Sequence, residues 1–160
     1  MSHPKLSDEI EIRQATRADL LEIMEIEKNS FPQPWPYDAF ARNLSNTGFF
    51  VAEYASGNNR TVVGFVVSDT IPNHGSPLGH IKDLAVDSAF REQGIGSALL
   101  ERALAYLRSQ DVNRVKLEVR ESNEAAISLY NSFGFEYHQT IQNYYKDGEN
   151  AYVLVSNLLK

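Results

Sequence analysis

The chain has 160 residues, of which 42% are hydrophobic and 22% charged, and this size and composition fit one globular domain. Its 21 acidic and 15 basic residues give a net charge of -6, which argues against direct nucleic-acid binding, because that function needs a basic surface. The absence of cysteine excludes a disulfide framework, a thiolate metal site and a cysteine nucleophile.

No targeting segment is visible at the start of the chain. Residues 1–9 contain Pro4 and acidic side chains but no apolar stretch, so they do not resemble a secretory signal. No window approaches the roughly 18 uninterrupted apolar residues of a membrane helix. We expect a cytoplasmic protein without membrane contact, with one domain over residues 1–160 in which residues 1–8 form a flexible tail.

The first half of the sequence predicts a strand, two helices and two further strands. Residues 10–13 alternate with period two, as in a strand. Thr16 and Asp19 have the spacing of a capping box, and the helix that follows must end before the prolines of residues 32–36. The remaining expected elements are a helix over 37–44 and strands over 49–54 and 61–67, joined by a turn at 56–59.

The second half predicts strands that alternate with helices. A loop over 72–79 precedes a strand over 80–86, a helix over 97–109, a strand over 114–120 and a helix over 123–133 that Gly134 ends. Asp147-Gly148 is a strong hairpin signal, so the last two strands are expected over 135–146 and 149–154. This order indicates an α/β protein with a mixed sheet, helices on both faces, and crossover connections in the middle.

The segment 91–97 lies between an expected strand and a well-formed helix. Gly94 and Gly96 allow a tight turn and the close approach of a ligand to the backbone. The free amides and the dipole at the start of the helix favour an anion there. The glycines alone are equally compatible with a turn that binds nothing. A dinucleotide site lacks its third glycine, and a nucleotide-triphosphate loop lacks its lysine.

Arg-x-x-Gly-x-Gly after Leu84-Ala85-Val86 resembles the pyrophosphate-binding motif of the GNAT acetyltransferase superfamily. The resemblance implies a mixed sheet of about seven strands with about four helices, splayed between the fourth and fifth strands. It implies acetyl-coenzyme A as co-substrate and no metal. Leu84, Ala85 and Val86 would face the pantetheine and thioester, and the pyrophosphate would contact Arg91, Glu92, Gln93, Gly94, Ile95, Gly96 and Ser97. Glu92 departs from the pattern, because close relatives often carry arginine there.

The strand 114–120 places Lys116, Glu118 and Arg120 on one face and apolar residues on the other. Periodicity alone favours a surface carboxylate that pairs with a neighbouring base. The continuation Leu117-Glu118-Val119-Arg120-Glu121-Ser122-Asn123, followed by Ala125-Ala126 and Leu129-Tyr130, resembles the N-terminal protein acetyltransferases of bacteria and archaea. Further matches are residues 31–35, 79–81 and 143–152, so the resemblance covers about residues 10–158.

This resemblance implies a role for each matching residue. Glu118 would be the general base, acting through water, and Tyr130 the general acid that protonates the leaving thiolate. Asn123 would contact the cofactor near its pantetheine. His80 would be a second candidate base or a water-holding residue. The peptide would contact Phe31, Tyr37, His80, Tyr144 and Tyr145.

The expected acceptor is the N-terminus of a protein or peptide, with a ribosomal protein as one candidate. An α-amine, with a pKa of about 7.7–8.0, loses its proton more easily than a lysine, with a pKa of about 10.4, by roughly 3.4 kcal/mol. This difference permits an N-terminal acceptor but does not require one. The alternatives are a GNAT enzyme that acetylates a small-molecule amine and a non-catalytic regulatory module that binds coenzyme A. The expected oligomeric state is a monomer or a weak homodimer.

Overall fold

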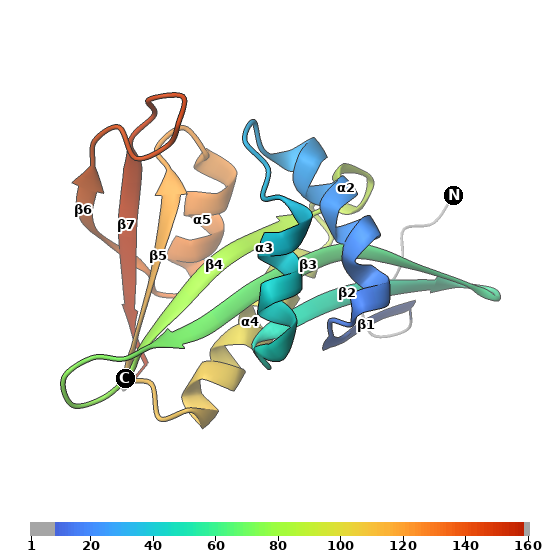
Figure 1. Cartoon of the computed structure of the whole chain (residues 1–160), viewed down its shortest axis with the longest axis horizontal. Helices are drawn as coiled ribbons and strands as arrows, with labels where there is room; N and C mark the ends of the chain where they lie inside the picture. Colours follow the sequence, from blue (N-terminus) through green and yellow to red (C-terminus); the bar gives the residue numbers. More distant parts are fainter. Residues whose placement is uncertain (1–8, 159–160) are drawn as a thin grey trace. The chain divides into compact units, whose positions relative to one another are not determined.

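The computed structural model describes residues 9–158, so the expected tail over residues 1–8 lies outside the described part. Seven strands form a sheet in the order β1-β2-β3-β4-β5-β7-β6, and residues 9–158 also contain four α-helices (Figure 1). This confirms the mixed seven-stranded sheet with helices that the resemblance implied. The chain divides into two compact units: unit 1 comprises residues 1–68 and 83–106, and unit 2 comprises residues 69–82 and 107–160.

The expected strands and α-helices are all present, although some of their bounds differ from the expected ones. The strands are β1 Ile10–Gln14, β2 Phe49–Ser56, β3 Asn59–Ile71, β4 Leu78–Val86, β5 Arg114–Arg120, β6 Glu136–Ile141 and β7 Ala151–Asn157. The α-helices are α2 Leu20–Ser30, α3 Tyr37–Arg42, α4 Ile95–Ser109 and α5 Glu124–Ser132. Short 3-10 turns are η1 Arg17–Asp19, η2 Asn43–Ser45 and η3 Ser88–Phe90.

The crossover connection predicted in the middle of the sheet is confirmed, because it joins two parallel strands. β4 pairs in parallel with β5, from Leu78 opposite Arg114 to Ile81 opposite Leu117, and these residues all belong to unit 2. The pairs β1–β2, β2–β3, β5–β7 and β6–β7 are antiparallel. Because β7 lies between β5 and β6 and is antiparallel to both, the segment that contains α5 joins two strands that run in the same direction.

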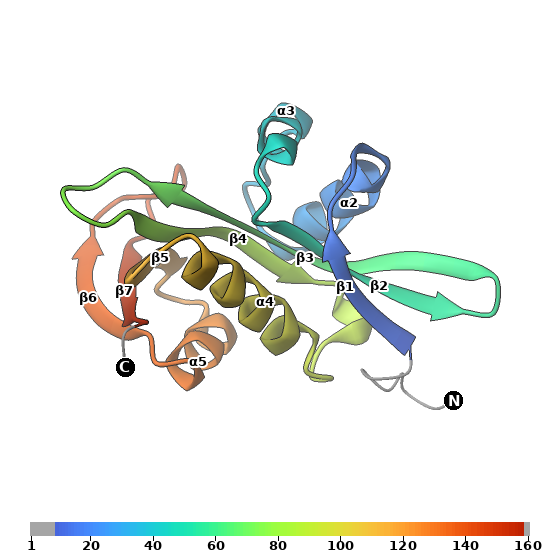
Figure 2. The ribbon, with the colours of Figure 1, turned by 90° about the horizontal axis from the view of Figure 1, so that it is seen from below.

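In unit 1, two layers of helices enclose the strands. Figure 2 shows α2 and α3 on one face of β1–β3 and α4 on the other. The core beneath α2 and α3 consists of Leu20, Ile23, Ile26, Phe40, Phe49, Val51, Val62, Phe65, Val67 and Ala85. Phe40 is fully buried, and its ring packs edge-on to Phe65 at 5.5 Å between centroids.

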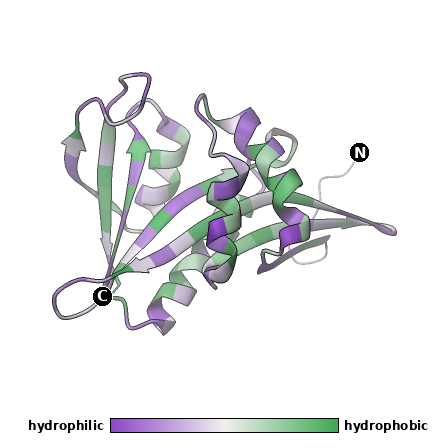
Figure 3. Cartoon of the chain, in the orientation of Figure 1, coloured by the Kyte–Doolittle hydropathy of each residue, from purple (hydrophilic) through white to green (hydrophobic). Residues whose placement is uncertain are grey.

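Helix α4 approaches the sheet of unit 1 closely at Gly64. A Cβ on Gly64 would lie 3.0 Å from Leu99 and 3.2 Å from the carbonyl oxygen of Ala85, so a side chain there would push the helix away. Leu99, Leu100 and Ala103 are completely buried beneath the helix. The bands of opposite hydropathy along α2 and α4 in Figure 3 match this arrangement of one apolar and one polar face.

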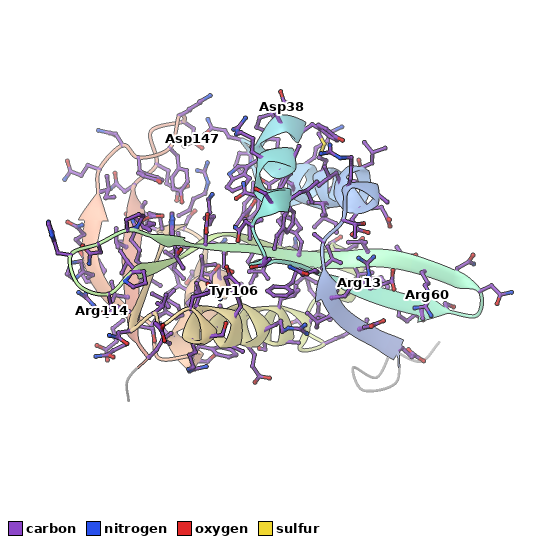
Figure 4. All side chains as sticks on the ribbon, turned by 60° about the horizontal axis from the view of Figure 1, so that its bottom comes forward. Arg13, Asp38, Arg60, Tyr106, Arg114 and Asp147 are labelled. Carbon is purple, nitrogen blue, oxygen red and sulfur yellow. The ribbon has the colours of Figure 1, made fainter. Side chains whose placement is uncertain are left out.

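A network of charged hydrogen bonds holds β1 and η1 within unit 1. The predicted capping box is present: the Thr16 amide donates to Asp19 at 2.7 Å, although the first turn is the 3-10 turn η1 rather than α-helix. Arg13 on β1 donates to Asp19 and to Glu53 at 2.9 Å, and Arg60 donates to Glu53 at 3.2 Å. Figure 4 labels Arg13 and Arg60 on these strands.

Unit 2 has its own apolar core under one face of β5 and β7. The predicted alternation in β5 is confirmed, since Val115, Leu117 and Val119 are at most 6% exposed. Phe135 is 2% exposed, and its ring lies 5.8 Å from that of Tyr130 on α5. The other face of β5 is thereby left for its polar residues.

Several expected boundaries were wrong. β4 begins at Leu78, α4 begins at Ile95 and β3 extends to Ile71. The largest difference is the hairpin, because β6 ends at Ile141 and β7 begins at Ala151. Gly148 does form a tight turn, with its amide donating to the Tyr145 carbonyl at 2.8 Å, but this turn lies inside a loop over residues 142–150. We call this segment the β6–β7 loop.

Candidate functional site

In unit 1, the segment 91–97 leads from η3 into the first turn of α4. The backbone turns sharply at Glu92 and Gly94, which have φ values of 63° and 82°. A Cβ placed on Gly94 would meet no heavy atom within 4 Å, so its outer side is open to a ligand. The amide of Ala98 donates to the Gly94 carbonyl at 3.0 Å. The backbone amides of residues 95–97 form the first turn of α4, where an amide has no acceptor within the helix. These features suit an anion.

The side chain of Arg91 folds back on the strand before the loop. Its Nε donates to the Val86 carbonyl at 3.1 Å, and its Nη2 lies 3.5 Å from the hydroxyl of Ser30. The turn between them is fixed by Asp87, whose carboxylate accepts the Ala89 amide at 2.9 Å. Arg91 therefore supplies a positive charge beside the loop and connects it to the end of β4.

In unit 2, the polar face of β5 carries a compact charged cluster. Glu118 has one oxygen 2.7 Å from His80 Nε2 and accepts from Lys116 Nζ at 2.8 Å with the other. His80 stands on β4 opposite Lys116, because the parallel register places those two residues side by side. The side chain of Glu118 is only 9% exposed, so both hydrogen bonds are largely shielded from water.

The surroundings of Glu118 keep its carboxylate ionised. Burial by itself raises the pKa, but the hydrogen bonds from His80 and Lys116 and their positive charges outweigh it and lower the pKa to about 2. A carboxylate with so low a pKa is a weak proton acceptor at neutral pH. It is well suited, however, to hold an imidazole in one orientation and to stabilise a charge that forms there.

The β6–β7 loop carries Tyr144 and Tyr145, whose rings meet edge-on at 5.0 Å. Arg120 at the end of β5 holds this loop: its Nη1 donates to Asp147 at 2.9 Å and to Glu149 at 2.8 Å, and its guanidinium lies 4.1 Å from the centre of the Tyr145 ring. Figure 4 labels Asp147 on this loop. The tyrosine pair is thus fixed by contacts within unit 2.

Both phenols remain neutral at physiological pH. Burial, with a further contribution from Tyr144, raises the pKa of Tyr145 to about 12. Burial and the negative charge of Glu118 raise the pKa of Tyr144 as well. Neutral phenols can donate and accept hydrogen bonds, which is a useful property near an amine.

Helix α5 carries the remaining two candidates from unit 2. Tyr130 is 6% exposed and packs on Phe135, so most of its ring belongs to the core. The side-chain oxygen of Asn123 accepts the Ala126 amide at 3.2 Å and caps the helix. Both residues have a structural role, and their roles as general acid and cofactor contact stay predictions.

The two candidates from unit 1 flank the proline-rich connection between α2 and α3. Phe31 is half-buried against the core, whereas Tyr37 is 36% exposed at the start of α3. The connection is held by Glu27, which accepts the Trp35 amide at 2.9 Å. Their contact with a peptide stays a prediction.

Three residues of these clusters were missed from sequence. Lys116 could have been found, because it shares the face of β5 with Glu118 at a spacing of two. Arg120 shares that face too, but its partners lie 27 and 29 residues further along the chain. Glu27 gave no signal beyond its helical spacing with buried residues.

Among residues 9–158, no group of three or more histidine, aspartate or glutamate side chains is placed to hold a metal ion. Within the same part of the chain, no helix is long and apolar enough to cross a membrane.

Comparison with known proteins agrees with the geometry of both units. The acetyltransferase (GNAT) family matches residues 20–135. An N-alpha-acetyltransferase of Sulfolobus acidocaldarius is 34% identical over 159 residues, covering 92% of each chain. A ribosomal-protein-alanine N-acetyltransferase of Escherichia coli is 31% identical over 140 residues, covering 86% of this chain and 90% of its own.

A solved structure extends the similarity to three dimensions. Naa50 of Arabidopsis thaliana, in complex with the bisubstrate analogue CoA-Ac-MVNAL, superposes with a TM-score of 0.82 at 26% identity. The match covers 94% of this chain and 99% of that one.

Proposed function

Because the chain belongs to the acetyltransferase (GNAT) family, we propose that it transfers an acetyl group from acetyl-coenzyme A to the N-terminal amine of proteins or peptides. The observation that carries this acceptor is the 34% identity, over 92% of the chain, to a protein named N-alpha-acetyltransferase. A ribosomal protein is one candidate acceptor, because a second relative carries that activity in its name.

Acetyl-coenzyme A supplies the activated acetyl thioester, and the features of unit 1 fit its pyrophosphate. The open side of Gly94, the free amides at the start of α4 and the charge of Arg91 together suit a dianionic group. The remaining loop residues, Glu92, Gln93, Ile95, Gly96 and Ser97, follow by resemblance. The resemblance also assigns Leu84, Ala85 and Val86 to the pantetheine. The Val86 amide would donate a hydrogen bond to the developing oxyanion. The structure of Naa50 with a coenzyme A-containing analogue supports the same donor.

In the reaction, the amine nitrogen forms a bond to the carbonyl carbon and the carbon–sulfur bond breaks. We propose that Glu118 and His80 act together to receive the amine proton through a water molecule. Glu118, with its low pKa, stays ionised and orients the imidazole of His80 through their 2.7 Å contact, so that the imidazole can receive the proton. Tyr130 would return a proton to the thiolate, and Asn123 would contact the cofactor.

The neutral acceptor amine is easier to obtain from an N-terminus than from a lysine, by roughly 3.4 kcal/mol. A weak base in the charged cluster of Glu118, His80 and Lys116 is sufficient to accept the proton of an N-terminal amine. By resemblance, Phe31, Tyr37, Tyr144 and Tyr145 are the proposed peptide contacts. We further propose that the protein is cytoplasmic and that the chain forms a single domain. We propose that it is a monomer or a weak homodimer.

The test is thiol release from acetyl-coenzyme A with a panel of peptides that begin with Ala, Ser or Met and contain one internal lysine. Mass spectrometry then locates the acetyl group. We expect modification at the N-terminus. Modification of polyamines or aminoglycosides without peptide turnover would favour a small-molecule acetyltransferase. Tight binding of acetyl-coenzyme A with no transfer at all would favour a regulatory module.

A further inference from the structure

Unit 1 contains two acidic side chains, each with a buried carboxyl oxygen, that the proposed reaction does not use. Glu27 on α2 is 1% exposed. Its Oε1 and the Oδ2 of Asp83 on β4 are both shielded from water, and neither faces a hydrogen-bond donor. Since a buried carboxylate oxygen without a donor is costly, the arrangement of this pair needs an explanation.

Each carboxyl group uses its other oxygen to hold a backbone amide. Glu27 Oε2 accepts from Trp35 at 2.9 Å, and Asp83 Oδ1 accepts from Leu84 at 2.9 Å. The carboxyl groups of Asp83 and Glu27 lie close enough together for Glu27 to raise the pKa of Asp83. Two ionised carboxylates contain only acceptors, so a hydrogen bond between their free oxygens requires a proton on one of them.

The electrostatic surroundings favour that proton. Burial raises the pKa of Asp83 well above its usual range, and the hydrogen bond and the charge of Glu27 raise it further, while the Leu84 amide lowers it. Two negative charges in contact away from water would repel strongly, whereas one shared proton satisfies both free oxygens.

We propose that Glu27 and Asp83 share one proton in the folded protein, and that this hydrogen bond positions the segment 31–36 against β4 beside Leu84. The chain of contacts runs from the Trp35 amide through Glu27 and Asp83 to the Leu84 amide. The segment begins with Phe31 and leads into Tyr37, and Leu84 is the first of the β4 residues proposed for the pantetheine. The consequence for catalysis rests on the proposed function, but the shared proton does not.

The chemistry of this pair makes two conservative variants informative. In Asp83→Asn, the amide nitrogen can donate to an ionised Glu27 while the amide oxygen accepts from Leu84. In Glu27→Gln, the amide nitrogen can donate to an ionised Asp83 while its oxygen accepts from Trp35. Each single variant therefore replaces the shared proton with an N–H donor and keeps all the contacts.

The double variant Glu27→Gln/Asp83→Asn cannot keep all of these hydrogen bonds. With both amide oxygens held by Trp35 and Leu84, two NH2 groups would face each other, and one must turn and lose its backbone partner. We expect its unfolding constant to exceed the product of the two single effects by roughly tenfold. A double variant that fails to fold, while both single variants fold, supports the pair equally.

The first measurement is urea unfolding as a function of pH, which is independent of catalysis. The folded wild type retains a proton that the unfolded chain releases above about pH 4, so its stability falls as pH rises towards the raised pKa of Asp83 in the folded protein. Relative to either single variant, the unfolding constant of the wild type should rise about tenfold per pH unit over that window. The control Glu25→Gln, an exposed acid on the same helix, should keep the wild-type slope.

The second measurement is the KM for an acetylatable peptide. We expect little change in the single variants and in Glu25→Gln, and an increase of about fivefold or more in a folded double variant, because the segment 31–36 loses its hold. Equal pH slopes in the wild type and Asp83→Asn would overturn the shared proton. Additive effects in the double variant would overturn the pairing. If the wild type acetylates no peptide, the proposed function fails, while the unfolding data still decide the shared proton.

Discussion

Each carboxylate oxygen of Glu118 has a hydrogen-bond partner, and these two contacts determine the protonation state in which Glu118 acts. The bonds from His80 and Lys116 keep its pKa at about 2, so its charge is constant over the whole working pH range. Activity should therefore rise with pH as the acceptor amine loses its proton, with no step from Glu118 above about pH 4.

Glu118→Gln should lower kcat by about 100-fold while leaving the Kd for acetyl-coenzyme A unchanged. The glutamine keeps the shape and a hydrogen bond to His80, but it no longer stabilises a positive charge on the imidazole. Steady-state kinetics and isothermal titration calorimetry separate these effects. Lys116→Gln serves as the matched control, because it removes a partner of the carboxylate but leaves the Glu118–His80 contact. Normal turnover in Glu118→Gln would exclude both of its proposed roles.

The turn before α4 is the proposed pyrophosphate site, and Glu92 is its one acidic side chain. Glu92→Gln removes the charge but keeps a side chain with the same backbone cost at a φ of 63°. We expect the Kd for acetyl-coenzyme A to fall about threefold at low ionic strength, and the gain to shrink in high salt. Glu101→Gln, an exposed acid further along α4, is the control. An unchanged Kd at low salt would mean that the carboxylate points away from the pyrophosphate.

In unit 2, the β6–β7 loop carries Tyr144 and Tyr145, which are proposed to contact the peptide. Arg120→Gln removes two ion pairs and the stacking on Tyr145, so the tyrosine pair should lose its fixed position. The peptide KM should rise about fivefold, with a smaller effect on kcat. Arg114→Gln at the exposed start of β5, labelled in Figure 4, should behave as wild type. A peptide KM that stays at the wild-type value would show that the loop does not contact the acceptor.

The same elements show what sequence could and could not provide. The face of β5 that carries Glu118 was predicted in full, because side chains alternate strictly in a strand. The contact with His80 was not, since it depends on the register between β4 and β5, which pairs residues 36 apart. The Asp147-Gly148 turn was identified correctly, but its context was wrong, because long-range contacts with Arg120 fix a loop where local pattern favoured a hairpin.

At the scale of the whole molecule, the ion pairs of Arg13 with Asp19 and Glu53 also contribute to stability. Their contribution decreases as the pH falls, whereas that of the Glu27–Asp83 pair decreases as the pH rises. Burial raises the pKa of Asp19, but hydrogen bonds from Arg13 and the Thr16 amide lower it overall; the hydrogen bond from Arg13 lowers the pKa of Glu53. A carboxyl group whose pKa is lower in the folded state stabilises the protein above its unfolded pKa of about 4. That contribution is lost as the pH falls through the folded pKa.

Arg13→Gln should therefore destabilise the protein by about 2 kcal/mol at neutral pH, since it removes charged hydrogen bonds from two largely buried carboxylates. The difference from wild type should diminish below about pH 4, where the carboxyl groups become protonated in both proteins. Urea unfolding at several pH values gives both quantities, with Arg17→Gln as the exposed control on η1. If the two curves stay parallel down to about pH 2, Arg13 stabilises unit 1 by packing rather than by charge, because protonation would then leave its contribution intact.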